Sequence, residues 1–283
     1  MAISPLPLRN GPELWRSYYP VLKPDGHKYD RGAALVYGGA EMTGAARLAT
    51  RAAQRMGAGL VTVATSTPSV RIYAEALESA IVRATDTLAE WQKNLDDPKV
   101  TAVLIGPGLG QGELQKSFVL AALATEKPCV LDADALTNFA ATPEVLFSKL
   151  HAHCVLTPHE GEFARLFGTR IKADAAKTDR ALQAAQIAKC IVLLKGAETV
   201  IASPDGQTLI NTNAPPWLAT AGAGDVLAGL ILGLLAQKMP IFWAAAAATW
   251  LHGDIATRFG QGLIAEDLVD GVPRAVQNLL DAD

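Results

Sequence analysis

Short runs of apolar residues recur along the chain without polar alternation, and each run is followed by a loop and a helical pattern. Such runs predict strands that are buried on both faces, and the helices between them predict parallel βαβ units. The strands are expected at residues 33–37, 60–64, 100–105, 128–131, 154–156 and 191–194. The pattern therefore predicts an α/β fold in which helices cover both faces of a largely parallel sheet.

The two ends of the chain have different patterns. Residues 1–29 contain several prolines and no clear periodicity, which predicts an irregular N-terminal segment that enters the fold across the surface. Residues 200–201 and 208–210 predict a hairpin, and the last third of the chain is predicted to be helical. Because no linker is visible, residues 30–283 are expected to form a single domain.

Composition narrows the class of protein. Half of the 283 residues are hydrophobic and 19% are charged, so a large core is available. The net charge of −3 argues against a nucleic-acid or anionic-membrane partner. The apolar helices are shorter than the roughly 20 residues that span a bilayer, and no signal peptide is visible. Three separated cysteines are interpreted as buried thiols. We expect a cytoplasmic protein.

Residues 219–229 carry the first candidate chemistry. Gly222, Ala223 and Gly224 precede Asp225, and an apolar helix follows directly. Glycines let backbone N–H groups approach an anion, and a helix N-terminus adds unpaired N–H groups and a positive dipole end. The stretch therefore predicts a phosphate-binding turn. Asp225 has two interpretations of equal weight, as a general base or as the N-cap of the helix.

Polar side chains also follow the ends of predicted strands, at the edge where α/β sheets bind ligands. Lys195 ends a buried strand, and its ammonium either extends to solvent or, as we favour, meets an anion. Asp134 is expected to cap a helix, whereas Asp132 is either a cap or a contact to Mg²⁺ or a hydroxyl-rich ligand. His159 is either a solvated loop residue or, as we favour, a ligand contact. Glu162 either acts through water on a phosphate-bound metal or opens its helix.

A second glycine-rich stretch, Gly-Pro-Gly-Leu-Gly at residues 106–110, is either a tight turn or a binding loop. It lacks the spacing of a dinucleotide fingerprint and the acidic residue expected about 20 positions later, which disfavours a Rossmann dehydrogenase. The remaining notable side chains have structural interpretations. The aromatic ones are expected to pack the C-terminal helices and the arginines to form a solvated helix face: Trp217, Trp243, Trp250 and His252, and Arg47, Arg51 and Arg55.

Taken together, these motifs resemble the ADP- or ATP-dependent NAD(P)H-hydrate dehydratase family of the ribokinase-like superfamily. The matching stretches occur in family order and cover nearly everything from Lys28 onward: residues 38–46, 106–110, 131–136, 156–162, 194–199 and 221–229. The resemblance implies a ribokinase-like three-layer sandwich. It also implies a lyase that uses ADP or ATP, with Mg²⁺, to remove water from the S form of hydrated NADH or NADPH.

The resemblance implies a role for each matching residue. The nucleotide would contact Lys195, Gly196, Ala197, Glu198, Thr199 and Gly224. The hydrated dinucleotide would contact Ala45, Gly108, His159 and Asp225. Asp225 would act as the base and Gly222, Ala223 and Gly224 as the anion hole. The terminal phosphoryl group would pass to the hydrate hydroxyl, and phosphate would then leave, with Mg²⁺ offsetting its charge.

The chain departs from the family pattern at three positions. Ala221 and Ala223 stand where the family has Gly followed by Thr or Ser, so a hydroxyl donor near the phosphate is missing. Glu160 stands where Pro is common. Two alternatives share the anion hole: a small-molecule kinase of the same superfamily acting on an alcohol such as hydroxyethylthiazole, and a nucleotide sensor without turnover.

The resemblance also bears on partners. It implies a homotetramer, in which the alanine-rich helices could pack across a symmetric interface. Many bacterial relatives carry an NAD(P)H-hydrate epimerase domain on the same chain, whereas only residues 1–29 precede the matching region here. An epimerase is therefore expected to be a separate protein unless this chain is a fragment. Bacterial members tend to use ADP, which is the expected nucleotide.

Overall fold

Ten strands form one sheet in the computed structural model, which describes residues 7–22 and 24–281. Their order is β1-β10-β9-β8-β7-β6-β5-β2-β3-β4, and within the described residues only β9 runs antiparallel to its neighbours. The strands are β1 (Leu8–Arg9), β2 (Ala33–Gly38), β3 (Leu60–Thr65), β4 (Ile81–Ala84), β5 (Val100–Ile105), β6 (Cys129–Leu131), β7 (Cys154–Leu156), β8 (Ile191–Leu194), β9 (Thr199–Ala202) and β10 (Thr208–Asn211).

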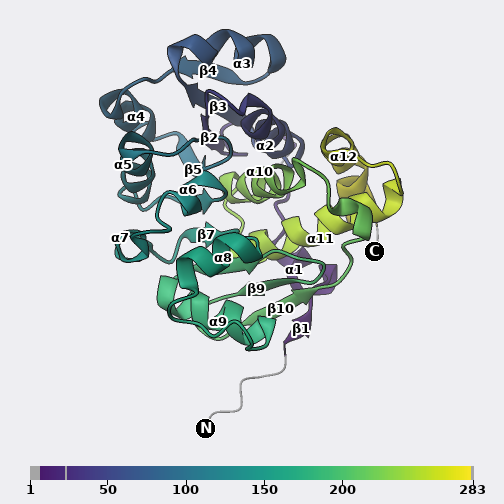
Figure 1. Cartoon of the computed structure of the whole chain (residues 1–283). Coiled ribbons are helices and arrows are strands. Elements are labelled where there is room, and N and C mark those ends of the chain that lie inside the picture. Colours follow the sequence, from purple (N-terminus) through teal and green to yellow (C-terminus); the bar gives the residue numbers. More distant parts are fainter. Residues whose placement is uncertain (1–6, 23, 282–283) are drawn as a thin grey trace.

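Helices cover both faces of this sheet (Figure 1). One hydrophobic core lies under α2, α10, α11 and α12, and a second lies under α4, α5, α8 and α9. The three-layer sandwich, the six buried strands and the β9–β10 hairpin are confirmed. The helices are α1 (Pro12–Trp15), α2 (Thr43–Arg55), α3 (Val70–Ala76), α4 (Leu88–Leu95), α5 (Glu113–Leu123), α6 (Asp134–Thr137), α7 (Pro143–Phe147), α8 (Glu160–Phe167), α9 (Lys177–Ala188), α10 (Ala223–Ala236), α11 (Ile241–Phe259) and α12 (Ala265–Asp281).

The N-terminal segment is built into the fold. β1 pairs in parallel with β10 at one edge of the sheet, and the fully buried Trp15 donates its indole N–H to Asn10 Oδ1 at 3.2 Å. Asn10 in turn donates to the carbonyl oxygen of Ala246 in α11 at 2.8 Å. The expectation of an irregular surface segment was therefore wrong for residues 8–18, whereas residues 24–30 are exposed and contain no helix or strand, as expected. Residues 1–6 and residue 23 lie outside the described part of the chain.

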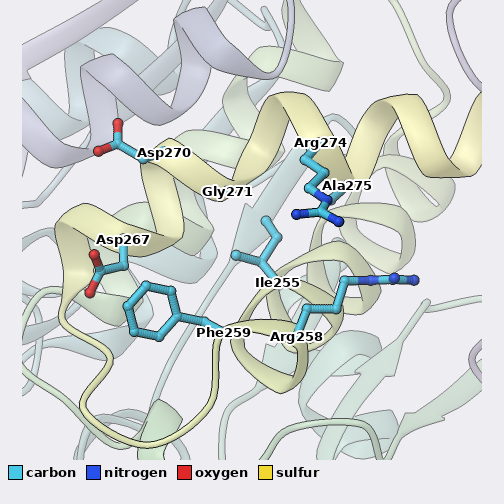
Figure 2. Close-up of a pocket in the computed structure, with 8 residues that line it drawn as sticks. All are labelled: Ile255, Arg258, Phe259, Asp267, Asp270, Gly271, Arg274 and Ala275. Atoms are coloured by element: carbon cyan, nitrogen blue, oxygen red, sulfur yellow. The ribbon is translucent and has the colours of Figure 1, made fainter.

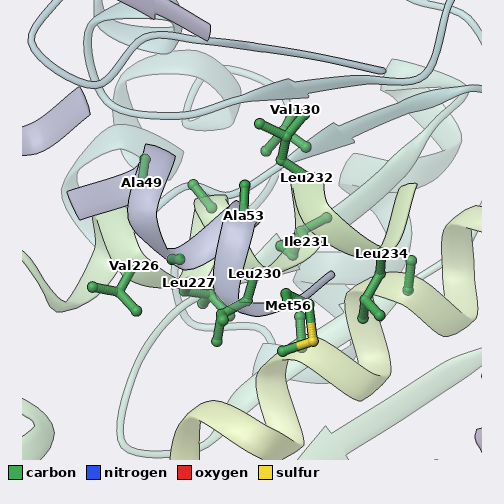
Figure 3. Packing of buried hydrophobic residues seen from close by; sticks show 14 of the residues in the cluster. Ala49, Ala53, Met56, Val130, Val226, Leu227, Leu230, Ile231, Leu232 and Leu234 are labelled. Atoms are coloured by element: carbon green, nitrogen blue, oxygen red, sulfur yellow. The ribbon is translucent and has the colours of Figure 1, made fainter. Parts of the chain in front are cut away.

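Helix α10 packs against α2, whose Ala49 and Ala53 lie beside it (Figure 3). A Cβ atom at Gly229 would lie 2.2 Å from the carbonyl oxygen of Ala49, and one at Gly233 would lie 2.7 Å from that of Ala53. Gly229 and Gly233 are four residues apart and so share one helix face. The backbones of α2 and α10 therefore touch, which fixes where α10 begins.

The strand order reverses between β2 and β5, and the loops that follow these two strands meet at that point. A Cβ atom at Gly39 would lie 1.2 Å from the carbonyl oxygen of Gly108, so only glycine fits there. In open α/β sheets such a reversal creates the crevice in which ligands bind. The glycine-rich loops that the sequence singled out thus lie at the topological switch point.

Several smaller expectations can be checked against burial. The three cysteines are buried and unpaired, as expected: Cys129, Cys154 and Cys190. Trp217 donates to the carbonyl oxygen of Ala256 at 2.7 Å, consistent with packing on the C-terminal helices. Arg51 and Arg55 are exposed, but the Nε atom of Arg47 is buried, so the arginine face is only partly solvated. Among the described residues no helix has the length and apolar character needed to cross a membrane.

The close contact between α2 and α10 predicts a stability change. Gly229→Val should lower the free energy of unfolding by about 1–3 kcal/mol or more, because the added carbons overlap the α2 backbone. Gly44→Ala in α2 is the matched control, since nothing lies within 4 Å of its Cβ position, and it should leave stability unchanged or raised. Urea unfolding measures both variants, and equal stabilities would contradict the packing argument.

Candidate functional site

A cavity of about 410 Å³ lies beside the N-terminus of α10. Five of the six residues expected to contact the nucleotide line it, and Glu198 is exposed and does not. The cavity therefore unites the end of β8 with the start of α10. Its lining residues are Lys195, Gly196, Ala197, Thr199, Asn211, Ala214, Pro215, Pro216, Leu218, Ala219, Ala223, Gly224, Leu227, Thr249 and His252.

The glycine turn at the head of α10 has the geometry of an anion site. Gly222 is the N-cap with a φ of 85°, a left-handed conformation that favours glycine, and no side chain caps this helix. Ala223 and Gly224 line the cavity, but the N–H of Ala223 already donates to the carbonyl oxygen of Thr220 at 3.3 Å. Asp225 stands in the first turn and is not the N-cap, so its capping interpretation was wrong.

Asp225 has the ionisation behaviour of a base that works near neutral pH. Burial raises its pKa from the ordinary 3.8 to about 7, and the negative charges of Asp132 and Asp134 add to this rise while Lys195 opposes it. A carboxyl group is most useful as a proton acceptor when its pKa is close to the working pH. The surroundings of Asp225 therefore suit proton transfer.

Lys195 is held by a buried carboxylate. Its ammonium donates to Asp132 Oδ1 at 2.7 Å, and the Asp132 side chain is only 2% exposed. Burial lowers the pKa of Lys195, but the charges of Asp132, Glu162 and Asp225 outweigh it and the pKa is raised overall, so Lys195 stays protonated. A Cβ atom at Gly224 would lie 3.5 Å from Nζ, which places the ammonium beside the anion turn.

His159 and Glu162 cap helix α8 together. His159 Nδ1 accepts from the backbone N–H of Gly161 at 2.9 Å, and Glu162 Oε2 accepts from the N–H of His159 at 2.8 Å. This is a capping box with histidine as the N-cap. Glu162 thus opens its helix, as one interpretation held. The His159 side chain is 54% exposed, and because Nδ1 accepts, the neutral ring carries its proton on Nε2.

Glu160 has a clear role in this chain. Its carboxylate accepts two hydrogen bonds from Arg180, at 2.7 and 3.1 Å, and lies 3.6 Å from Lys177 Nζ. Lys177 donates to the carbonyl oxygens of Lys195 and Glu198, at 3.0 and 2.7 Å. Glu160 therefore holds Lys177 in place, and Lys177 in turn stabilises the loop of residues 195–198. Sequence reasoning missed Lys177, because it begins a helix with no motif around it.

The residues expected to hold the hydrated dinucleotide lie along the switch point. Ala45 is in the first turn of α2, and Gly108 lies in the loop after β5. Asp134, which was expected to cap α6, instead accepts from the N–H of Gly110 at 2.9 Å, and Ala133 is the N-cap. These residues do not line the cavity of 410 Å³. Ala45, Gly108 and His159 therefore lie outside the cavity that holds most of the residues expected to contact the nucleotide.

The carboxylates of the site suit a metal that arrives with phosphate. In the described residues no group of three or more His, Cys, Asp or Glu side chains is placed to hold a metal ion. Mg²⁺ is usually held by one or two carboxylates together with phosphate oxygens and waters. Asp132 already pairs with Lys195, and one oxygen of Glu162 is used in the capping box. The donor set fits nucleotide-bound Mg²⁺ and not a dedicated protein cage.

A larger hollow of about 530 Å³ lies between α11 and α12 (Figure 2). Asp267 and Asp270 of α12 and Arg258 of α11 line it, together with the exposed ring of Phe259. None of the residues singled out by the sequence for chemistry is among its lining residues. The smaller cavity at the carboxyl edge of the sheet is therefore the candidate site.

Comparison with known proteins gives the same family as the motifs. The model of the NAD(P)H-hydrate dehydratase family matches residues 33–273. A bifunctional NAD(P)H-hydrate repair enzyme of Salinibacter ruber is 39% identical over 92% of this chain and 51% of its own length. An ADP-dependent (S)-NAD(P)H-hydrate dehydratase of Neisseria meningitidis is 37% identical over 82% of this chain and 78% of its own.

A solved structure extends the likeness to the fold. The Bacillus subtilis ADP/ATP-dependent NAD(P)H-hydrate dehydratase, crystallised with ATP and Mg²⁺, has a TM-score of 0.82 and 30% identity, covering 97% of this chain and 99% of that one. This chain spans about half the length of the bifunctional relatives that it matches. The family model covers most of the sequence, and the chain belongs to the NAD(P)H-hydrate dehydratase family.

Proposed function

We propose that this chain is a nucleotide-dependent (S)-NAD(P)H-hydrate dehydratase, a hydro-lyase that restores NADH or NADPH from the hydrate. The observation that carries the proposal is Asp225, a carboxyl group with a pKa of about 7 that stands in the helix turn directly after Gly222–Gly224 and interacts with the charge of Lys195. A site meant only to hold phosphate is better without such a carboxylate. The names of the Neisseria and Bacillus relatives support the same activity.

In the proposed reaction the hydrate hydroxyl attacks the terminal phosphorus of ADP or ATP. An oxygen–phosphorus bond forms, the bond to the bridging oxygen breaks, and the shortened nucleotide leaves with the electron pair. Asp225 takes the hydroxyl proton, and the Gly222–Gly224 N–H groups and Lys195 stabilise the transferring phosphoryl group.

The second step is an elimination. The carbon–oxygen bond breaks as the ring nitrogen donates its lone pair, inorganic phosphate departs, and the neighbouring ring carbon loses a proton to restore the dihydropyridine. When bound together with the nucleotide, Mg²⁺ would offset the negative charge of the phosphates. The missing hydroxyl at Ala223 leaves the backbone donors intact, so we propose that turnover persists, at a lower rate than with Thr or Ser at this position.

The individual roles expected for the site residues are part of this proposal. Lys195, Gly196, Ala197, Thr199 and Gly224 contact the nucleotide, and their shared cavity supports that role. For Glu198 only the loop backbone is suitably placed, because its side chain is exposed. We propose that the second ligand contacts Ala45, Gly108, His159 and Asp225; Asp225 stands in the first turn of α10 and is not among the residues that line the cavity. ADP is the proposed nucleotide, as in the name of the Neisseria relative.

Other expectations stay predictions. We propose one dehydratase domain over residues 30–283, which the single sheet supports. We also propose a cytoplasmic protein whose activity is linked to that of an NAD(P)H-hydrate epimerase. The alanine faces that were expected to support a homotetramer are buried within one chain, for example Ala52 of α2 and Ala246 of α11. That argument for a tetramer therefore fails, although the family resemblance still predicts one.

The activity itself is tested by giving the purified protein hydrated NADH, Mg²⁺ and either ADP or ATP. We expect absorbance at the NADH band to recover, with phosphate released in equal amount and faster with ADP. A stable phosphorylated alcohol from hydroxyethylthiazole-type substrates, without recovery of NADH, would favour the kinase. Nucleotide binding without phosphate release would favour the sensor.

The raised pKa of Asp225 predicts a pH profile. The base works only when deprotonated, so kcat/KM should rise as pH increases through about 7. Asp225→Asn should lower kcat by about 10²–10⁴ and abolish the pH dependence of this limb, with ADP affinity unchanged or tighter.

The same pKa predicts a stability effect. Because folding raises the pKa of Asp225 from 3.8 to about 7, the free energy of unfolding falls as pH rises through this range. At pH 8 the variant should therefore melt no lower than the wild type.

The control for this experiment is Asp179→Asn, which removes an exposed carboxylate from the first turn of α9. It should leave kcat and the pH profile unchanged. A kcat of Asp225→Asn near that of the wild type would refute the role of Asp225 as base.

The buried pair of Lys195 and Asp132 predicts two separable effects. Lys195→Met should raise the KM for ADP by about 10- to 100-fold through loss of a charge-assisted contact. It should also lower the free energy of unfolding by about 3–5 kcal/mol, because Asp132 is left buried and unpaired. Combining Lys195→Met with Asp132→Asn should restore most of the stability but not the KM. Recovery of a normal KM in the double variant would show that Lys195 only neutralises Asp132.

A further inference from the structure

A buried histidine in the cavity wall has an unused hydrogen-bonding atom. His252, in α11, is 6% exposed, and its Nε2 atom is buried without a partner among the described residues. Buried polar atoms in proteins nearly always have a hydrogen-bond partner, because a buried atom without one destabilises the fold. From the sequence we expected His252 only to pack among the C-terminal helices. Its place in the lining of the cavity means that a bound ligand can supply what the protein does not.

The protonation state of the ring limits what that ligand atom can be. Burial lowers the pKa of His252 to about 4, the charge of Lys195 lowers it further, and a hydrogen bond with the Ala223 backbone opposes both. The imidazole is therefore neutral at physiological pH. The Ala223 backbone raises the pKa of the ring, which is the effect of a carbonyl oxygen that a ring N–H faces. Since Nε2 has no partner, this donor is Nδ1, and a neutral ring then has an acceptor at Nε2.

An acceptor requires a donor on the ligand, and phosphate oxygens are excluded because they are acceptors themselves. A nucleoside diphosphate has two kinds of neutral donor, the ribose hydroxyls and the amino group of adenine. Ala223 is the first residue of α10 and adjoins the anion turn, so the ring that bonds to it lies near the phosphate end of the cavity. The ribose is the neighbour of the phosphates, whereas the base is farther away.

We propose that Nε2 of His252 accepts a hydrogen bond from a ribose hydroxyl of the bound nucleotide, and that the enzyme thereby selects ribonucleotides over deoxyribonucleotides. The proposal rests on the proposed function, because it takes the cavity to be the nucleotide site. It assigns a specificity role to a residue outside the glycine-rich motifs. Loss of a hydrogen bond weakens binding more when the acceptor is buried, because water cannot replace the missing donor there.

The test compares the binding of four nucleotides by calorimetry: ADP, 2′-deoxy-ADP, 3′-deoxy-ADP and inosine diphosphate, which lacks the amino group. Wild-type protein should bind one of the two deoxy analogues roughly tenfold more weakly than ADP and should bind inosine diphosphate about as well as ADP. Equal affinity for ADP and both deoxy analogues would overturn the proposal without any variant.

Variants then assign the discrimination to the ring. His252→Leu should weaken ADP binding to about the affinity of the discriminated analogue and so abolish the difference. Thr249→Val is the control, because this hydroxyl lines the same cavity but already donates to the carbonyl oxygen of Ala245 at 2.7 Å. It should keep the wild-type discrimination. A general packing defect would weaken all four nucleotides alike and leave their ratio unchanged.

Three outcomes separate the possibilities. Discrimination that persists in His252→Leu would overturn the proposal. A wild-type preference for ADP over inosine diphosphate that disappears in this variant would also overturn it, because the adenine base and not the ribose would then contact Nε2. His252→Leu should melt at or above the wild-type temperature, because it removes an unsatisfied buried atom. Failure of the wild type to bind ADP at all would instead overturn the proposed function itself.

Discussion

The contact between α10 and α2 is the constraint on which the site depends. Gly229 and Gly233 let the α10 backbone rest on that of α2, and no side chain of any size could be inserted between them. Because both helices are packed on the sheet, this contact fixes the position of the α10 N-terminus relative to the ends of the strands. The anion turn, Asp225 and one wall of the cavity all follow from that single position. The chemistry of the first turn is thus determined by the packing of the second and third.

The charges around Lys195 suit both the binding of a phosphate and the action of Asp225 as a proton acceptor. Its ammonium forms an ion pair with Asp132 and also interacts at longer range with the charges of Glu162 and Asp225. It therefore neutralises Asp132 but not the other two carboxylates. A phosphate bound at the turn adds negative charge close to Asp225, which raises its proton affinity further. Nucleotide binding would therefore make Asp225 a stronger base at the moment when a hydroxyl must lose its proton.

The buried parallel strands could be predicted because their sequences are apolar on both faces, and this placed the loops at one edge. β4 (Ile81–Ala84) escaped prediction because three of its four residues are exposed. Trp15 was missed because its burial depends on partners over two hundred residues away, such as Trp250. The capping interpretation of Asp225 failed because composition cannot show which residue takes the left-handed φ. The Lys195–Asp132 pair joins two strand ends that only the sheet order brings together.

The edges of the sheet have a consequence for how the molecule avoids aggregation. An exposed edge strand offers unpaired N–H and C=O groups to any other chain, and natural proteins shorten such strands or place charges on them. Here β1 has two residues, one of them Arg9, and the opposite edge strand, β4, contains Arg83. Both ends of a ten-stranded sheet are thus poor templates for continued pairing. Copies of this chain that meet in solution would do so through their helical layers, and growth into a continuous intermolecular sheet is disfavoured.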